Sequence, residues 1–98
     1  MNIVKNLDGQ KLEVTLEGQL DTKSAPELTK EISDDLSQVT EVVMDFERVE
    51  YVSSAGMRAL MLARKTLGDR GTITVTNAND MVKEVFALTG FDRLLILA

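Results

Sequence analysis

Two adjacent serines, Ser53 and Ser54, stand where an apolar, strand-forming run gives way to an amphipathic helical pattern. The first turn of a helix has backbone N–H groups without partners and carries the positive end of the helix dipole. A phosphate added to a serine at this place would be stabilised there. Serine is also a common N-cap, which contributes about 1 kcal/mol to stability. The position alone therefore fits both a structural role and a phosphorylation site.

The composition argues against most kinds of catalysis. The 98 residues include no His and no Cys, which removes the usual general base, the thiol nucleophile and the common zinc ligands. The sequence also lacks the Gly-x-x-x-x-Gly-Lys-Ser/Thr loop that cradles nucleotide phosphates, and it has no oxygen-ligand metal motif. We therefore expect a protein that is not an enzyme and uses neither a cofactor nor a metal.

Charge and hydropathy restrict the partners. Sixteen acidic and eleven basic residues leave a net charge of −5, without a basic run that could follow nucleic-acid phosphates. No apolar run approaches the ~20 residues of a membrane span, and the N-terminus has no signal-peptide core. We expect a cytoplasmic monomer that binds neither nucleic acid nor membrane.

Hydrophobic periodicity predicts the element order β-β-α-β-α-β-α-β. The turn Asp8-Gly9 joins the first two strands in a hairpin. Ser24 and Glu27 fit a capping box at the start of the first helix. Val42–Met44 does not alternate, which predicts a strand buried on both faces, and 48–51 is expected to form a turn. The strands are expected at about 3–7, 11–17, 42–46, 72–76 and 94–97, and the helices at about 25–38, 55–68 and 80–89.

Helices between successive strands require crossover connections and hence mostly parallel pairing. The expected fold is α/β: a mixed sheet with an N-terminal antiparallel hairpin, then parallel βα units, with helices packed on it. Residues 1–98 are expected to form a single domain. Sites in such sheets gather at the carboxyl ends of the strands. The strand at 42–46 leads directly to Ser53 and Ser54.

Three blocks of this sequence resemble the STAS domains, the sulfate transporter and anti-sigma factor antagonist family. The run Asp45-Phe-x-x-Val-x-Tyr-Val-Ser-Ser-Ala-Gly-Met resembles the family's Asp-Leu-x-x-Val-x-Phe-Ile-Asp-Ser-Ser-Gly-Leu. Upstream, Gly18-Gln-Leu-Asp21 is similar to the family's Gly-Glu-Leu-Asp loop. Downstream, 82–90 is similar to its penultimate helix and glycine end. The resemblance implies a STAS-like fold over nearly the whole chain, with the C-terminal helix of longer members absent or cut off.

The resemblance also implies roles for particular residues. Ser54 matches the serine that a partner kinase phosphorylates, with Ser53, where many members have Asp, as the alternative. Asp21 matches the loop aspartate beside it, and Gly56 matches the glycine of the motif. The expected partner-binding and switch residues are Asp21, Ser53, Ala55, Gly56, Met57 and Arg58.

Three functions can be weighed on this basis. The first is an anti-sigma factor antagonist that binds an anti-sigma factor and so releases a sigma factor for transcription. The anti-sigma factor would be a serine kinase that uses ATP to phosphorylate Ser54 and end the interaction, and a phosphatase would reset it. The alternative is a STAS scaffold or interaction domain without a switch or a sigma-factor role, or a STAS domain cut from a transporter, which the absence of a membrane segment disfavours. The third, an enzyme, is disfavoured by the missing motifs.

Overall fold

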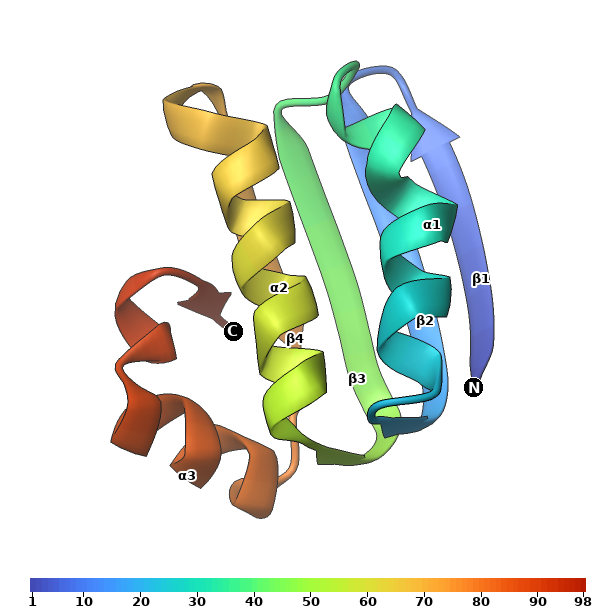
Figure 1. Cartoon of the computed structure of the whole chain (residues 1–98). Helices are drawn as coiled ribbons and strands as arrows, with labels where there is room; N and C mark the ends of the chain where they lie inside the picture. The colour runs from blue at the N-terminus through green and yellow to red at the C-terminus, as the bar shows by residue number, and fades with distance from the viewer.

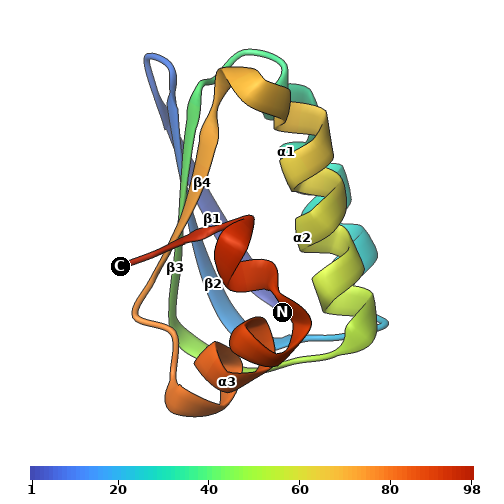
Figure 2. The same ribbon diagram turned by 90° about the vertical axis from the view of Figure 1, so that its left-hand side faces the viewer.

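A single five-stranded sheet carries two long helices side by side on one face (Figures 1 and 2). The computed structural model describes residues 1–98. The elements in chain order are β1 (Asn2–Asp8), β2 (Lys11–Leu20), α1 (Ser24–Leu36), β3 (Glu41–Val52), α2 (Ser54–Leu67), the short 3₁₀ helix η1 (Gly68–Arg70), β4 (Thr72–Thr76), α3 (Asp80–Thr89), a second 3₁₀ helix η2 (Phe91–Arg93) and β5 (Ile96–Leu97).

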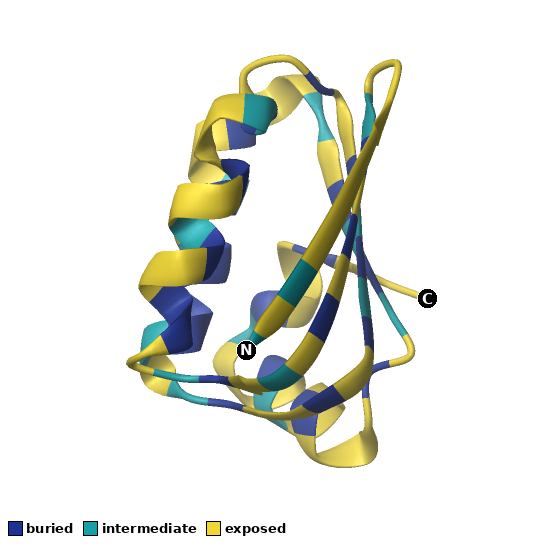
Figure 3. Cartoon of the chain, turned by 90° about the vertical axis from the view of Figure 1, so that its right-hand side faces the viewer, coloured by how far each residue is buried: buried dark blue, intermediate teal, exposed yellow.

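The strands lie in the sheet in their order along the chain. β1 pairs antiparallel with β2, whereas β2 to β5 pair in parallel. The predicted fold class, with its N-terminal hairpin and parallel βα units, is confirmed. β1 is an edge strand and is exposed along most of its length (Figure 3).

The core lies between the sheet and the two long helices. The helical stripes that face the sheet include Leu28 and Ile32 of α1 and Leu60 of α2, all of them buried. α3 lies at the end of the sheet where β3 finishes (Figure 2), and the ring of Phe86 packs 6.2 Å from that of Phe46. The apolar faces of the long helices are therefore buried against one face of the sheet (Figure 2).

The expectation that Val42–Met44 is buried on both faces is wrong. Val42 and Met44 are fully buried beneath the helices, but Val43 is only half-buried on the opposite face. No helix covers that face, so β3 alternates as a half-buried strand does. The neighbours of Val43 in the sheet are Glu13 on β2 and Thr74 on β4.

The expected turn at 48–51 is also wrong, because β3 continues to Val52. The register shifts twice, and β3 has one more residue than β2 at each shift, which marks two bulges. The Asp45 carboxylate supports the first bulge by accepting a hydrogen bond from the Glu47 N–H at 3.0 Å. β2 likewise extends to Leu20, past its expected end. The longer strands leave only Ser53 between β3 and α2.

The expected capping box at Ser24 is wrong as well. Ser24 is the buried first residue of α1, with Lys23 before it at the N-cap position, and no hydrogen bond joins Ser24 to the Glu27 side chain. The Asp21 carboxylate accepts hydrogen bonds from the N–H groups of Lys23 and Ser24, at 3.0 and 3.1 Å. The Ser24 hydroxyl accepts in return from the Asp21 N–H at 2.9 Å. The reciprocal cap therefore joins residues 21 and 24 rather than 24 and 27.

The C-terminal strand is shorter than expected. The η2 turn occupies Phe91–Arg93, and the Leu95 N–H donates back to the Phe91 carbonyl at 3.0 Å. Leu95 is thereby buried, and only Ile96 and Leu97 remain to pair with β4.

The three α-helices begin and end within two residues of the predicted bounds, and Asn79 and Gly90 lie at the two ends of α3 as predicted.

Candidate functional site

The two serines at the junction of β3 and α2 have different structural roles. Ser53 is the N-cap: it is half-buried, and its hydroxyl accepts a hydrogen bond from the Gly56 N–H at 3.3 Å. Ser54 is the first residue of α2 and is exposed, and its hydroxyl has no hydrogen-bond partner within the chain. The geometry therefore assigns the capping role to Ser53 and leaves the Ser54 hydroxyl free.

Asp21 lies next to this junction because β2 and β3 end together. Leu20 pairs with Val52, and the Ser53 N–H donates to the Leu20 carbonyl at 2.8 Å. Asp21 and Ser53 are thus the residues that directly follow two paired strand ends. This is the edge of a parallel sheet at which sites are expected.

The carboxylate of Asp21 accepts hydrogen bonds at the start of α1. The Ser24 backbone N–H, the Lys23 N–H and the Ser24 hydroxyl all donate to it, and they hold the pKa of Asp21 below its ordinary value of 3.8. Hydrogen bonds to a charged carboxylate favour the charged form. A carboxylate held in this way is a poor proton acceptor, but it keeps a negative charge close to the serines.

The remaining predicted switch residues follow on the first turns of α2. Ala55 is half-buried, Gly56 is buried against the end of β2, and Met57 is 6% exposed. Arg58 is exposed, and none of the three ion pairs of the chain includes it. Ser54 and Arg58 are therefore the two predicted residues of this helix that solvent or a partner reaches freely.

A shallow groove of about 460 Å³ runs between α2 and the α3–η2 segment, directly beside Ser54. Besides residues of the predicted site, the groove is lined by Val52, Met61, Val85, Thr89 and Phe91. Sequence reasoning missed Val85, Thr89 and Phe91, because only the packing of α3 against the end of β3 brings them near Ser54. The apolar period of 82–88 indicated a helix but not which residues would stay at its surface.

None of the helices combines the length and the apolar character that crossing a membrane requires. Nor do three or more His, Cys, Asp or Glu side chains gather where they could hold a metal ion.

The fold and the junction together define a class of protein, a mixed α/β domain that presents a serine at the N-terminus of a surface helix. The family model described as "Mlab, STAS domain" matches residues 3–97. The chain belongs to the STAS domain family. BtrV of Bordetella bronchiseptica, which bears the name of anti-sigma factor antagonist, is 32% identical over 87 residues, which cover 87% of this chain and 74% of that protein.

Solved structures share the fold. SpoIIAA, an anti-sigma factor antagonist, matches in its unphosphorylated form with a TM-score of 0.86 and 21% identity, over 99% of this chain and 88% of that one. The phosphorylated form of SpoIIAA from Bacillus matches with a TM-score of 0.79 and 20% identity, over 99% and 91%. An anti-sigma factor antagonist from Mycobacterium paratuberculosis matches with a TM-score of 0.87 and 23% identity, over 98% of this chain and 83% of that one. The predicted family, STAS domains of the anti-sigma factor antagonist type, is confirmed.

Proposed function

We propose that this protein is an anti-sigma factor antagonist that phosphorylation of Ser54 switches off. In the unphosphorylated state it binds an anti-sigma factor, so that a sigma factor is released for transcription. Membership of the family and the likeness to BtrV support the regulatory role. The observation that carries the switch is that the Ser54 hydroxyl is exposed and unbonded, whereas the Ser53 hydroxyl caps the helix.

The phosphoryl donor and the base belong to the partner in this proposal. The Ser54 oxygen attacks the γ-phosphorus of ATP, the bond to the β,γ-bridging oxygen breaks, ADP leaves, and a base on the kinase takes the hydroxyl proton. This chain has no His, and its nearby carboxylate, Asp21, already accepts three hydrogen bonds. The chain is therefore a kinase substrate and not an enzyme. A phosphatase restores the free hydroxyl.

The phosphate acts at the partner surface rather than on the fold. It adds about −1.5 to −2 charge, which the positive end of α2 tolerates. Residues 53–58 and Asp21 form the proposed contact surface of a cytoplasmic monomer. A dianion within it would have to lose its hydration or face like charge, at a cost of several kcal/mol in binding free energy.

Incubation of the protein with its anti-sigma factor kinase and ATP tests the proposal. We expect a mass increase of one phosphate, which tandem mass spectrometry places on Ser54. Ser54→Ala should remain unmodified and still bind the anti-sigma factor. Ser54→Asp should fold normally yet bind weakly in calorimetry.

Ser53→Asp is the matched control, because Asp is as good an N-cap as Ser and the fold should be kept. Because the side chain at position 53 faces the Gly56 N–H, we expect this variant to lose less binding than Ser54→Asp. If Ser53→Asp loses binding while Ser54→Asp keeps it, Ser53 is the modified hydroxyl. If the kinase modifies neither serine, the alternative stands: a STAS interaction domain without a switch.

A further inference from the structure

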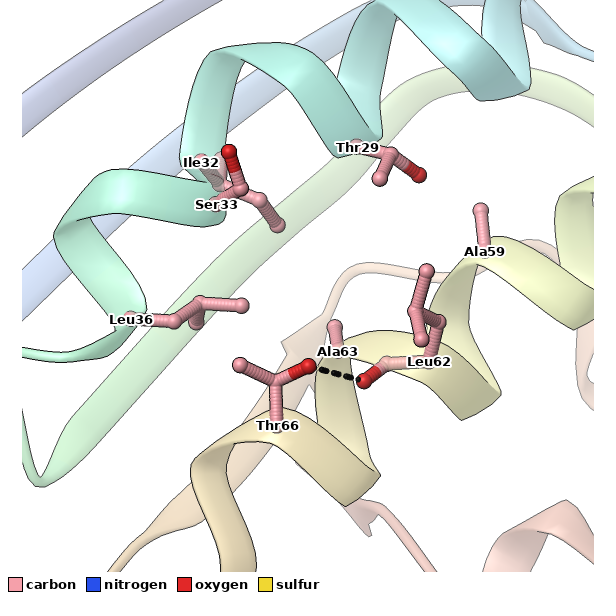
Figure 4. A pocket seen from close by; sticks show the side chains of 8 residues that line it. All are labelled: Thr29, Ile32, Ser33, Leu36, Ala59, Leu62, Ala63 and Thr66. Carbon is pink, nitrogen blue, oxygen red and sulfur yellow. Dashed lines mark hydrogen bonds between the residues drawn. The ribbon is translucent and has the colours of Figure 1, made fainter.

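A second groove separates α1 from α2 on the outer surface of the helical layer. Its deepest part is a hollow of about 80 Å³, and the side chains of the two helices face each other across it (Figure 4). The floor is apolar, with Ile32 and Leu36 from α1 and Ala59 and Ala63 from α2. Leu62 stands at the rim and is 50% exposed. A hollow of this volume, lined mainly by apolar side chains, has room for one aliphatic side chain.

The groove continues as an open furrow toward the N-terminal ends of both helices. Two cations line it, Lys30 on α1 and Arg58 on α2, and the chain pairs neither with a carboxylate within 4.0 Å. No Asp or Glu lines the hollow or the furrow, although acidic residues outnumber basic ones by sixteen to eleven in the chain. The groove therefore has an apolar floor, and the only charged side chains that line it are cations.

We propose that this groove binds an acidic amphipathic helix of a partner protein. Such a helix would place an apolar side chain in the hollow beside Ala59 and Ala63. Its carboxylates would meet Lys30 and Arg58 at the rim. A helix that lies in a groove through apolar anchors, with charges that select its orientation, is a common mode of peptide recognition. This groove lies on the side of α2 that faces α1, whereas the groove beside Ser54 lies on the side that faces α3, and Arg58 lines both.

A second copy of this chain is a poorer occupant. The acidic helix it could offer is α1, which carries Glu27, Glu31, Asp34 and Asp35. The apolar stripe of α1, however, is already buried against the sheet. A second copy therefore supplies the charge but not the apolar anchor.

The test uses two synthetic peptides of about 18 residues, long enough to be partly helical in water. Both carry Leu at helical spacing in an Ala-rich background, one with Glu and the other with Lys at the flanking positions. Titration into the ¹⁵N-labelled protein is followed by NMR. We expect the Glu peptide to shift the amides of Thr29, Ser33, Ala59, Leu62 and Ala63. The Lys peptide should bind at least tenfold more weakly at low salt.

Two pairs of variants separate the contributions. Lys30→Glu with Arg58→Glu should reverse the preference between the peptides, whereas Lys65→Glu, an exposed change on α2 outside the groove, should not. Ser33→Phe fills the hollow from an exposed position and should abolish the amide shifts, and Gln38→Phe is its control. Equal binding of both peptides, shifts confined to the α2–α3 groove, or concentration-dependent dimerisation that Ser33→Phe prevents would each overturn the proposal.

Discussion

Gly56 and Leu20 approach so closely that no side chain fits between them. A Cβ atom on Gly56 would lie 2.6 Å from the Leu20 carbonyl oxygen and 2.8 Å from Leu20 Cγ. The same carbonyl accepts the Ser53 N–H, so the first turn of α2 is fastened to the end of β2 at two adjacent points. This contact places the serines beside Asp21, and it gives a packing reason for the glycine of the motif.

Gly56→Ala should therefore destabilise the protein and move the first turn of α2. Overpacking of a tight contact costs about 1–3 kcal/mol, and here the obstacle is backbone, which cannot rotate away. Urea unfolding measures the loss, and amide shifts of residues 21 and 53–55 report the displacement. Gly9→Ala is the comparison, because Gly9 has φ +60° but open space around it. It should lose stability without moving those amides, and equal shifts in both variants would contradict this reading.

The order of elements and the position of the serine pair were predictable from the sequence, whereas the lengths of the strands at the site were not. Alternating apolar residues predict the strand at 11–17, and apolar residues at helical spacing predict the helices. The bulges of β3 break the alternation, so Arg48–Tyr51 resembles a solvated turn although it pairs with β2. The cap at Asp21 could not be predicted either, because it depends on a tertiary contact. Ser24-Ala-Pro-Glu27 matches a capping box in sequence, but the Ser24 hydroxyl donates to the Gln19 carbonyl at 2.6 Å, and this bond holds Ser24 inside the fold.

The cap at Asp21 should make the stability of the protein depend on pH in acid. The folded-state pKa of Asp21 lies below its ordinary value of 3.8, so the unfolded chain binds the proton first as the pH falls. The stabilisation is complete above the unfolded pKa and is lost as the pH falls through the folded pKa. Urea unfolding between pH 2 and 7 measures the free energy of unfolding of the wild type and of Asp21→Asn. The difference between the two free energies should be constant near neutrality and shrink in acid.

Asp92→Asn removes an exposed carboxylate that accepts no hydrogen bond and is the charge-matched control. Its difference from wild type should not follow the same curve. A difference for Asp21→Asn that stays constant down to pH 2 would show that the carboxylate does not act through its charge.

Arg58 should bind the phosphate once Ser54 is modified. The two residues are four apart on α2, the spacing at which side chains meet on a helix, and Arg58 has no carboxylate partner. A pair of this kind contributes about 0.2–0.5 kcal/mol, so Arg58→Gln should raise the second pKa of the phosphoserine by about 0.2–0.4. Titration of the phosphorylated protein by ³¹P NMR measures this. Lys65→Gln, three turns along the helix, should leave that pKa unchanged.

Arg70 should stabilise the fold by joining the C-terminal ends of the two long helices. Its guanidinium donates to the carbonyls of Leu36 and Ser37 at the end of α1, at 2.7 and 3.1 Å, and to the Leu67 carbonyl at the end of α2, at 3.0 Å. These carbonyls lie at the C-terminal ends of α1 and α2, where the helix dipole is negative. Arg70→Ala should lower the free energy of unfolding by about 1.5–3 kcal/mol, the range for hydrogen bonds to a charged group. Arg70→Lys should recover part of the loss, since an ammonium keeps the charge but cannot span both helix ends.

Arg93→Ala is the control. Arg93 is an exposed arginine without such contacts, and its replacement should change the free energy of unfolding by less than about 0.5 kcal/mol. Chemical denaturation of the three variants decides the matter, and a loss for Arg70→Ala no larger than that for Arg93→Ala would show that solvent satisfies the helix ends equally well.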